Sequence, residues 1–343
     1  MTGPVRVAVV GLGYWGPNLV RVLHEVSEAH VIAACDLDER KLAKLGQRYP
    51  ALRLTSRFED LLAAEIDALA IATSVSTHYP LALAALEAGK HVFVEKPMAS
   101  SAREAQQLCD VAAARGLTLM PGHTFLYSPP VNLVRELIHS GALGEIYFVS
   151  TSRVNLGLHQ SDISVLWDLG PHDFSILRYW LDETPSSVAA LSRSCVLPGT
   201  PDVTFINLEF PSGTIGHVEL AWLAPSKLRR TAVVGSQKMV VYDDTSSEPV
   251  RIFDSGVSLP DPETFGEYKL TYRTGDIVSP HIPAAEPLLL ELGDFCGAIE
   301  ERREPRSSAA VGLDVVRVIE AADRSNALSG RPHALGPTLV PLG

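Results

Sequence analysis

The sequence predicts an α/β protein with two domains, an N-terminal doubly wound parallel sheet and a C-terminal α+β domain built on a mostly antiparallel sheet. With 343 residues the chain exceeds the size at which a single hydrophobic core keeps growing. Residues 1–122 alternate short apolar runs with helix-like segments, which is typical of βαβ units. Beyond residue 203 the chain is rich in β-like runs separated by turns. We therefore place the domains at 1–122 and 123–343.

The first domain is expected to hold parallel strands with helices between them. The run 68–72 is apolar at every position, as in strands that helices cover on both faces. Ser56 with Glu59, and Ser101 with Glu104, have the spacing of a capping box, which predicts a helix start at each pair. In order, the predicted strands are 5–11, 31–36, 53–55, 68–73, 91–95 and 118–122.

The second domain is expected to begin with a helix, a strand and a second helix, followed by a β-rich region and a helical tail. The tripeptides at 211–213 and 235–237 combine serine and glycine between β-like runs and predict hairpin turns. The predicted helices cover 130–140, 168–181, 287–301 and 309–328. The predicted strands cover 146–155, 204–210, 214–223, 230–234 and 238–242.

Composition argues against several classes of protein. Hydrophobic residues make up 46% and charged residues 20% of the chain, which is ordinary for a globular protein. The net charge of −11 argues against binding to nucleic acid or anionic membranes, although a local basic cluster would still accept an anionic substrate. The sequence shows neither a basic leader segment nor an apolar run of membrane-spanning length, so we expect a cytoplasmic protein.

The cysteines favour neither a disulfide framework nor a zinc site. They are far apart in the sequence and form no C-x-x-C pair, so we expect small buried hydrophobic side chains in a reducing compartment. No bound metal is expected. The cysteines are Cys35, Cys109, Cys195 and Cys296.

A glycine-rich segment follows the first predicted strand and indicates a dinucleotide site. Gly11, Gly13 and Gly16 form G-x-G-x-x-G where a strand turns into a helix, with Tyr14 and Trp15 before the last glycine. The glycines permit a tight turn, close approach of the backbone to a pyrophosphate, and close packing of helix on strand. The helix N-terminus then presents N–H groups and partial positive charge to the phosphates. This is the Rossmann fingerprint in its required context.

The second predicted strand ends at Asp36, where a carboxylate can accept hydrogen bonds from both ribose hydroxyls of NAD. The same charge would repel the extra phosphate of NADP, so NAD is the expected cofactor and NADP the less favoured one. The alternative is that Asp36 is an exposed turn residue, with Arg40 as a partner for a phosphate. The fingerprint and its acidic residue together favour NAD.

Lys96 directly follows the fifth predicted strand and is the first candidate catalytic residue. Ligands of open α/β sheets bind beyond the carboxyl ends of the strands, so Lys96 is expected to project toward the cofactor. A cation there polarises the substrate oxygen that gains or loses charge during hydride transfer. From these residues alone, an exposed lysine at a strand end is an equally good interpretation.

The segment Glu95-Lys96-Pro97 resembles the signature of the glucose–fructose oxidoreductase, inositol dehydrogenase and rhizopine catabolism family (Gfo/Idh/MocA), and the resemblance extends over nearly the whole chain. It implies that Lys96 is catalytic and that the peptide bond after it is cis. Segment 72–78 resembles the family's loop along the cofactor. The expected cofactor-binding residues are Gly11, Gly13, Tyr14, Trp15, Gly16, Asp36, Thr73, His78, Glu95 and Lys96.

The second domain supplies the matching half of the predicted site. Segment 168–172 resembles the family's D-x-x-x-H element, in which Asp168 and His172 flank the substrate. A separation of four residues places both on one face of a helix. The carboxylate raises the basicity of the imidazole and orients it, so His172 can take the proton of an alcohol as hydride leaves the carbon. The alternatives are a capping Asp168 beside a surface histidine, and Asp173 as the partner, although adjacent helical residues point apart.

Shorter segments resemble the family branch that acts on UDP-N-acetylhexosamines and related amino sugars. By this resemblance Tyr127, Arg153 and Asn155 line the substrate cleft with His172, and strand or turn positions outside the cleft are the alternative. Asp294 departs from the branch, in which histidine is frequent at this position. The segments are 11–19, 122–127, 153–157 and 276–283.

The sequence thus predicts an NAD-dependent sugar dehydrogenase or ketoreductase in which Lys96 and His172 act on one carbinol and Asp168 supports His172. The expected substrate is an amino sugar, nucleotide sugar or aminoglycoside that reacts at C3, and a composition rich in Ala fits antibiotic sugar biosynthesis. Two alternatives are an NAD-sensing regulator without catalysis, and a sugar–sugar oxidoreductase that retains its nicotinamide. A homodimer or homotetramer is expected, because exposed apolar sheet faces are usually covered.

Overall fold

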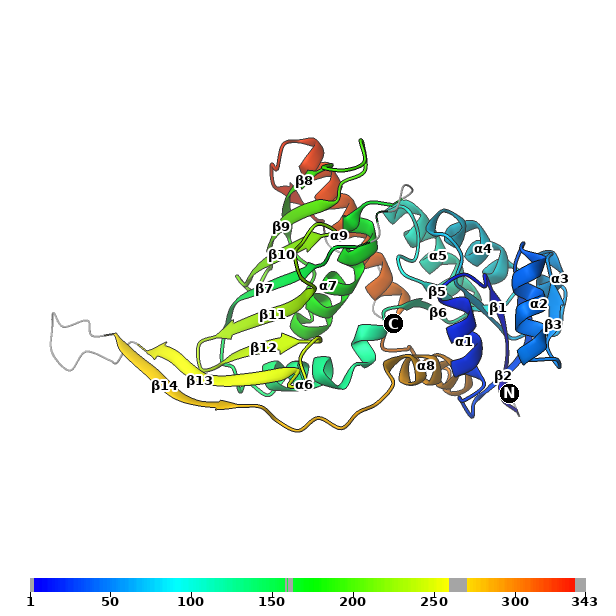
Figure 1. Ribbon diagram of the computed structural model, residues 1–343, viewed down its shortest axis with the longest axis horizontal. Coiled ribbons are helices and arrows are strands. Elements are labelled where there is room, and N and C mark those ends of the chain that lie inside the picture. Colours follow the sequence, from blue (N-terminus) through cyan, green and yellow to red (C-terminus); the bar gives the residue numbers. More distant parts are fainter. Residues whose placement is uncertain (1–2, 158, 160–162, 259–269, 337–343) are drawn as a thin grey trace. The chain divides into compact units, whose positions relative to one another are not determined.

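The computed structural model describes residues 3–157, 159, 163–258 and 270–336, which fall into two compact units (Figure 1). The first unit contains the described residues up to Tyr127 and also the later segment Ala285–Arg317. The second contains Ser128–Ala284 and resumes at Val318. The boundary expected at residue 122 differs from this division, because part of the predicted helical tail packs with the N-terminal sheet.

A six-stranded parallel sheet forms the centre of the first unit, in the order β3-β2-β1-β4-β5-β6. The chain moves outward from β1 to β3 and then returns to place β4 on the other side of β1, which confirms the predicted doubly wound fold. Every residue of β4 is buried, as its uninterrupted apolar sequence predicts. The strands are β1 Val5–Val10, β2 Ala29–Cys35, β3 Arg53–Thr55, β4 Ala68–Ile71, β5 His91–Glu95 and β6 Leu119–Gly122.

Helices pack on this sheet, and one of them comes from far along the chain. Helix α8 packs against α1 and β1, whereas α4 packs against α5. The Phe295 side chain of α8 is fully buried, and its ring centroid lies 5.9 Å from that of Phe93 in β5. This burial joins α8 to the first unit. The helices are α1 Gly16–Leu23, α2 Glu39–Arg48, α3 Glu59–Leu62, α4 Val75–Glu87, α5 Ala102–Arg115, the 3₁₀ turn η1 Thr124–Tyr127, and α8 Pro287–Glu301.

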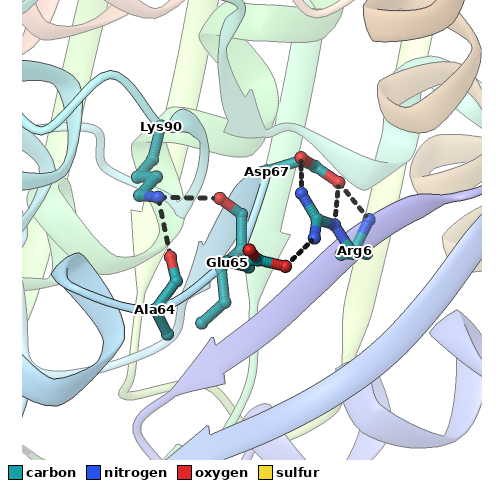
Figure 2. Close-up of polar contacts among 6 residues, drawn as sticks. Arg6, Ala64, Glu65, Asp67 and Lys90 are labelled. Atoms are coloured by element: carbon teal, nitrogen blue, oxygen red, sulfur yellow. Dashed lines mark hydrogen bonds and ion pairs between the residues drawn. The ribbon is translucent and has the colours of Figure 1, made fainter. Parts of the chain in front are cut away.

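A cluster of polar contacts ties together the amino-terminal ends of β1, β4 and β5 (Figure 2). Arg6 of β1 donates from Nε and Nη2 to Asp67, directly before β4, at 2.9 Å each. These bonds lower the pKa of the Asp67 carboxyl. Lys90, directly before β5, donates to the carbonyl oxygens of Ala64 and Ile66 at 3.0 and 2.9 Å. Because ligands of such sheets bind at the opposite, carboxyl ends, we assign this cluster to strand alignment rather than to chemistry.

A nine-stranded sheet forms the second unit, in the order β14-β13-β12-β11-β7-β10-β9-β8-β15. Within this second sheet, as far as the structure describes it, only β7 and β10 pair in parallel, so the sheet is mostly antiparallel as predicted. Helix α7 packs against β7, β9 and β10, and α6 packs against β12. The helices are α6 Pro129–His139 and α7 Val165–Leu181, and the division between the units falls within α9 Ala309–Ala327.

The strands of this sheet include several that the sequence did not predict. Strand Thr271–Val278 is exposed at nearly every position, so no apolar alternation marks it in the sequence. Strand Ser187–Arg193 buries only Val188 and Ala190. The strands are β7 Ile146–Val154, β8 Ser187–Arg193, β9 Val203–Glu209, β10 Ile215–Ala221, β11 Leu228–Gly235, β12 Met239–Asp243, β13 Val250–Ser258, β14 Thr271–Val278 and β15 His333–Ala334.

The two predicted capping boxes have different outcomes. Ser101 Oγ accepts a hydrogen bond from the backbone N–H of Glu104 at 3.2 Å, as predicted. Ser56 caps no helix, and α3 begins without a side-chain cap. Thr55, at the end of β3, is the residue that reaches the first turn, where its hydroxyl donates to Asp60 at 2.7 Å.

Two further observations concern the cysteines and the helices. Cys195 is exposed, which corrects the expectation that all the cysteines are buried, and the other three are buried free thiols. Cys195 lies in the segment after β8, where its backbone N–H donates to the Asp202 carboxylate at 3.0 Å. Within the described ranges, we find no helix with both the length and the apolar character needed to cross a membrane.

Candidate active site

The glycines between β1 and α1 are required for different reasons. Gly11 has a φ of +89°, and a Cβ there would lie 2.6 Å from the carbonyl oxygen of Ala72. A Cβ on Gly16 would overlap the carbonyl oxygen of Gly11. A Cβ on Gly13, in contrast, would meet no protein atom within 4 Å. Backbone packing therefore demands glycine at two positions, whereas the open backbone at Gly13 fits close approach by a pyrophosphate.

The start of α1 fits the same ligand. Trp15 is the N-cap residue, and its side chain makes no hydrogen bond to the first turn of the helix. Pro17 has no N–H, and the N–H of Asn18 donates to the carbonyl oxygen of Trp15 at 2.9 Å, so the positive end of the helix dipole is the feature of this helix start that suits phosphate oxygens. Tyr14 and Trp15 are 83% and 42% exposed. The sequence-predicted phosphate site is therefore compatible with the geometry of this segment, and contact of Tyr14 and Trp15 with the cofactor stays a prediction.

Asp36 lies directly after β2 and links the glycine segment to the next turn. Its Oδ2 accepts a hydrogen bond from the backbone N–H of Leu12 at 2.6 Å, and its Oδ1 accepts from that of Asp38 at 2.8 Å. Lys41 Nζ lies 3.5 Å from the same Oδ2. Arg40, the alternative phosphate partner, pairs with Asp38 at 3.0 Å. The carboxylate is held beside the glycines, where the predicted bond to the ribose would form.

The segments after β4 and β5 are joined through His78. The Lys96–Pro97 peptide bond is cis, as the resemblance implied. His78 Nδ1 lies 2.9 Å from the carbonyl oxygen of Pro97, and His78 Nε2 lies 3.1 Å from that of Thr73. The imidazole is 1% exposed, and burial lowers its pKa. His78 thus occupies an interior position and holds together two segments that carry other candidate residues, and its contact with the cofactor stays a prediction.

Buried titratable side chains lie near Lys96 in the first unit. Glu95 is opposite Gly122 in the register of β5 and β6, and burial raises the pKa of Glu95 to about 7. His123 follows β6, and burial together with the charge of Lys96 lowers its pKa to about 3. Glu291 of α8 accepts a hydrogen bond from Thr124 Oγ1 at 2.6 Å, and burial raises its pKa well above the ordinary value. The charge next to Lys96 therefore changes near neutral pH, when Glu95 titrates.

Tyr127 is buried and its hydroxyl is engaged within the first unit. Its side chain is 2% exposed, and its hydroxyl donates to Asp294 Oδ2 at 2.7 Å. The hydroxyl also accepts from the backbone N–H of Ser307 at 3.1 Å, and the Arg306 guanidinium lies 4.9 Å from the ring centroid. Asp294 and its neighbours enclose the ring, and the contact of Tyr127 with substrate stays a prediction. Asp294, noted as a departure from related chains, is the partner of this tyrosine.

In the second unit, α7 carries the acid–imidazole pair. Asp168 and His172 are four residues apart within this helix and so lie on one face. Both are partly exposed. The indole Nε1 of Trp222 donates to Asp168 Oδ2 at 3.3 Å. Asp173, the alternative partner of His172, is buried and pairs with Arg153, so its carboxylate is engaged elsewhere. The helix therefore places both side chains on one face, and their joint role in acid–base chemistry stays a prediction.

Arg153 and Asn155 were predicted as substrate residues and differ in position. Arg153 is 5% exposed, and its Nε donates to Asp173 Oδ2 at 2.6 Å. Thr151 Oγ1 donates to the same carboxylate at 2.8 Å. A guanidinium enclosed in this way holds β7 against α7, and its predicted role in the substrate cleft stays a prediction. Asn155 follows β7 and is partly exposed, so its contact with substrate stays a prediction.

Sequence reasoning overlooked Trp222, His123 and Glu291. Glu291 lies in an otherwise apolar stripe of α8 with Leu288 and Phe295, and an acid on the apolar face of a helix is a signal that could have been used. His123 directly follows a strand that ends at the ligand edge of the sheet, which is also a readable signal. No local pattern distinguishes Trp222 from a core tryptophan.

Comparison with known proteins identifies the family. Residues 5–123 match the model described as the oxidoreductase family with an NAD-binding Rossmann fold, and residues 131–241 match the GFO/IDH/MocA C-terminal domain. The chain belongs to the Gfo/Idh/MocA family. The chain is therefore an NAD-dependent oxidoreductase, an enzyme of the sugar and polyol dehydrogenase type.

Individual relatives of this Gfo/Idh/MocA enzyme are distant in sequence. It is 23% identical to the uncharacterized oxidoreductase YrbE of Bacillus subtilis over 98% of each chain. It is 29% identical to inositol 2-dehydrogenase 3 of Saccharopolyspora erythraea over 60% of this chain and 61% of that protein. Among solved structures, GenD2 from gentamicin A biosynthesis, in complex with NAD, is 25% identical, with a TM-score of 0.82 over 98% of each chain. The NAD in that complex agrees with the fit of the glycine segment.

Proposed function

We propose that the enzyme transfers a hydride between NAD and a secondary hydroxyl or keto group of a sugar, at C3 of an amino sugar, nucleotide sugar or aminoglycoside. The observation that carries this proposal is the full-length likeness to GenD2, whose context is the biosynthesis of an aminoglycoside. The segments around 11–19, 122–127, 153–157 and 276–283, which resemble the amino-sugar branch, support the same class. A role in antibiotic-type sugar biosynthesis follows from both.

Each candidate residue then has a defined task in the reaction. During oxidation of the alcohol, an imidazole nitrogen of His172 accepts the hydroxyl proton, and Asp168 stabilises the imidazolium that forms. Lys96 donates a hydrogen bond to the substrate oxygen and stabilises its negative charge. When bound, NAD would supply the nicotinamide carbon that accepts the hydride. In the direction of reduction, His172 returns its proton to the oxygen of the new alcohol.

A substrate screen with two variants tests the proposal. UDP-N-acetylglucosamine, glucose 6-phosphate, inositols and aminoglycosides are each mixed with NAD, and NADH formation is followed by absorbance. We expect turnover with amino sugars or aminoglycosides. We expect Lys96→Ala and His172→Ala to lower kcat by about 10²–10⁴-fold, the usual contribution of general acid–base groups, while NAD binding measured by calorimetry persists. Full activity of both variants would contradict the assigned roles, and turnover of inositols alone would contradict the substrate class.

We also propose that the enzyme is a homodimer or homotetramer. One face of the sheet in the second unit exposes apolar side chains on neighbouring strands, namely Leu191, Phe148, Phe205 and Ile215. Burial of such a face against a second copy removes apolar surface from water. Light scattering of the purified protein is expected to give twice or four times the chain mass, and Phe205→Asp is expected to shift it toward the monomer. A monomer at all concentrations would contradict this.

A further inference from the structure

Trp222 connects the end of β10 to the carboxylate of Asp168. It directly follows β10, and its indole Nε1–H donates to Asp168 Oδ2 at 3.3 Å. The side chain is 2% exposed, so solvent cannot readily replace this donor. Hydrogen bonds to charged groups are stronger than those between neutral groups, and they orient the acceptor.

The indole is held in place by its surroundings. The backbone N–H of Trp222 donates to the carbonyl oxygen of Asp202 at 2.9 Å, and its own carbonyl accepts from Gly157 N–H at 2.9 Å. A Cβ on Gly157 would lie 2.8 Å from the indole Cδ1, so the segment after β7 passes directly against the ring. The His159 ring meets the indole edge-on, with centroids 5.5 Å apart. The donor is therefore fixed by the scaffold and is not a mobile side chain.

We propose that Trp222 is a positioning residue for the acid–imidazole pair of α7: its indole N–H holds the Asp168 carboxylate in the rotamer that supports His172. This rests on the proposed roles of Asp168 and His172. An aspartate on a helix has several rotamers within reach, and proton transfer depends on orientation so strongly that a displacement of about 1 Å costs as much as 10²-fold in rate. The hydrogen bond from Trp222 restricts the Asp168 side chain to one of these rotamers.

Trp222→Phe tests the proposal, because it removes the N–H and retains most of the ring. We expect kcat to fall about tenfold, with the KM for NAD and the thermal midpoint close to those of the controls. The matched controls are Trp180→Phe, which removes a buried indole bond to the carbonyl of Val131, and Trp167→Phe, which removes an indole bond to the carboxylate of Asp323. Both are expected to keep the kcat of the unmodified enzyme.

A double-mutant cycle separates positioning from a general loss of packing. If Trp222 acts through Asp168, the double variant Trp222→Phe with Asp168→Asn is no slower than Asp168→Asn alone. Additive losses in the cycle, or a Trp222→Phe kcat equal to that of the controls, would overturn the proposal while leaving the proposed function intact. Full activity of Asp168→Asn would instead overturn the role of Asp168 itself, and with it the basis of the inference.

Discussion

The glycines between β1 and α1 separate what the fold requires from what a ligand requires. Gly16 lies so close to Gly11 that a methyl group would overlap its carbonyl oxygen, whereas Gly13 has open space around its Cα. A motif match in the sequence treats the positions alike, but the structure predicts different consequences for each substitution. Stability and NAD affinity should therefore respond to different glycines.

Gly13→Ala is expected to weaken NAD binding by about tenfold or more, because the added methyl group occupies the place of closest approach to the pyrophosphate. Its thermal midpoint should stay unchanged or rise slightly, since alanine restricts the unfolded chain. Gly16→Ala should instead lower the midpoint. Calorimetric titration with NAD and thermal unfolding of both variants provide the measurement. Wild-type NAD affinity in Gly13→Ala would show that this backbone does not face the cofactor.

The buried Glu95 carboxyl makes the free energy of unfolding depend on pH. Its folded pKa is about 7 and its ordinary value 4.5, so between these the native state binds a proton that the unfolded chain lacks. The free energy of unfolding is therefore expected to fall as pH rises through this window, by about 3 kcal/mol at about 1.4 kcal/mol per pKa unit. Glu95→Gln should flatten the decline between pH 4.5 and 7.

The control for this prediction is Glu300→Gln, which changes an exposed glutamate of α8. Denaturant titrations of the unmodified enzyme and the two variants across the same pH range give the free energies. We expect Glu300→Gln to follow the unmodified enzyme at every pH. If the free energy of unfolding of Glu95→Gln declines with pH as steeply as that of the unmodified enzyme, another buried group causes the pH dependence. Glu291, whose pKa is also raised by burial, is the first candidate.

At the scale of elements, a buried ion pair fixes β7 against the helix that carries the acid–imidazole pair. Arg153 of β7 and Asp173 of α7 are 5% and 3% exposed, and their Nε and Oδ2 atoms are 2.6 Å apart. Asp173 bonds directly to the buried guanidinium, and Asp244 is a further negative charge that acts on Arg153, so removal of the Asp173 charge leaves Arg153 without its direct counter-ion. At the end of α7, Asp182 pairs with Arg135 of α6, and this more exposed pair serves as the comparison.

Asp173→Asn is expected to cost about 3–5 kcal/mol of the free energy of unfolding, because it leaves the Arg153 guanidinium buried beside a neutral amide. Asp182→Asn is expected to cost less than about 1 kcal/mol, as exposed pairs contribute little and asparagine tolerates the left-handed backbone of this residue, whose φ is 52°. Chemical denaturation measures both. Equal losses would show that the buried pair contributes no more to the free energy of unfolding than the exposed pair.

The sequence predicts elements well where periodicity reflects burial. The six strands of the first sheet agree with prediction, and apolar runs mark all of them except the short β3, which contains Arg53 and Thr55. Strand Thr271–Val278 was missed because it is exposed on nearly every residue. The partners of Arg153 and Tyr127 were not predicted, because no spacing in the sequence reveals that these residues bond to Asp173 and Asp294. Pairings over such distances are set by packing, which local patterns do not encode.

At the scale of the whole molecule, the nucleotide-binding unit is not contiguous in the sequence. Helix α8 follows the second sheet along the chain, yet its Phe295 is fully buried beside Phe93 of β5. The same helix brings Glu291 to Thr124, at the end of the first sheet. Residues 1–122 alone would therefore expose the apolar surface that α8 covers, and the boundary drawn from the sequence would not yield a stable domain.

Two matched substitutions test this organisation. Phe295→Ala in α8 and Phe210→Ala after β9 each remove one buried phenyl ring, and each should cost about 3–5 kcal/mol. NAD stabilises only the unit that binds it, so in calorimetry the transition that rises with NAD concentration marks the first unit. We expect Phe295→Ala to lower that transition and Phe210→Ala to lower the other. If Phe295→Ala lowered only the transition that NAD leaves unchanged, α8 would belong energetically to the second unit. One shared transition for both variants would mean that the units unfold together.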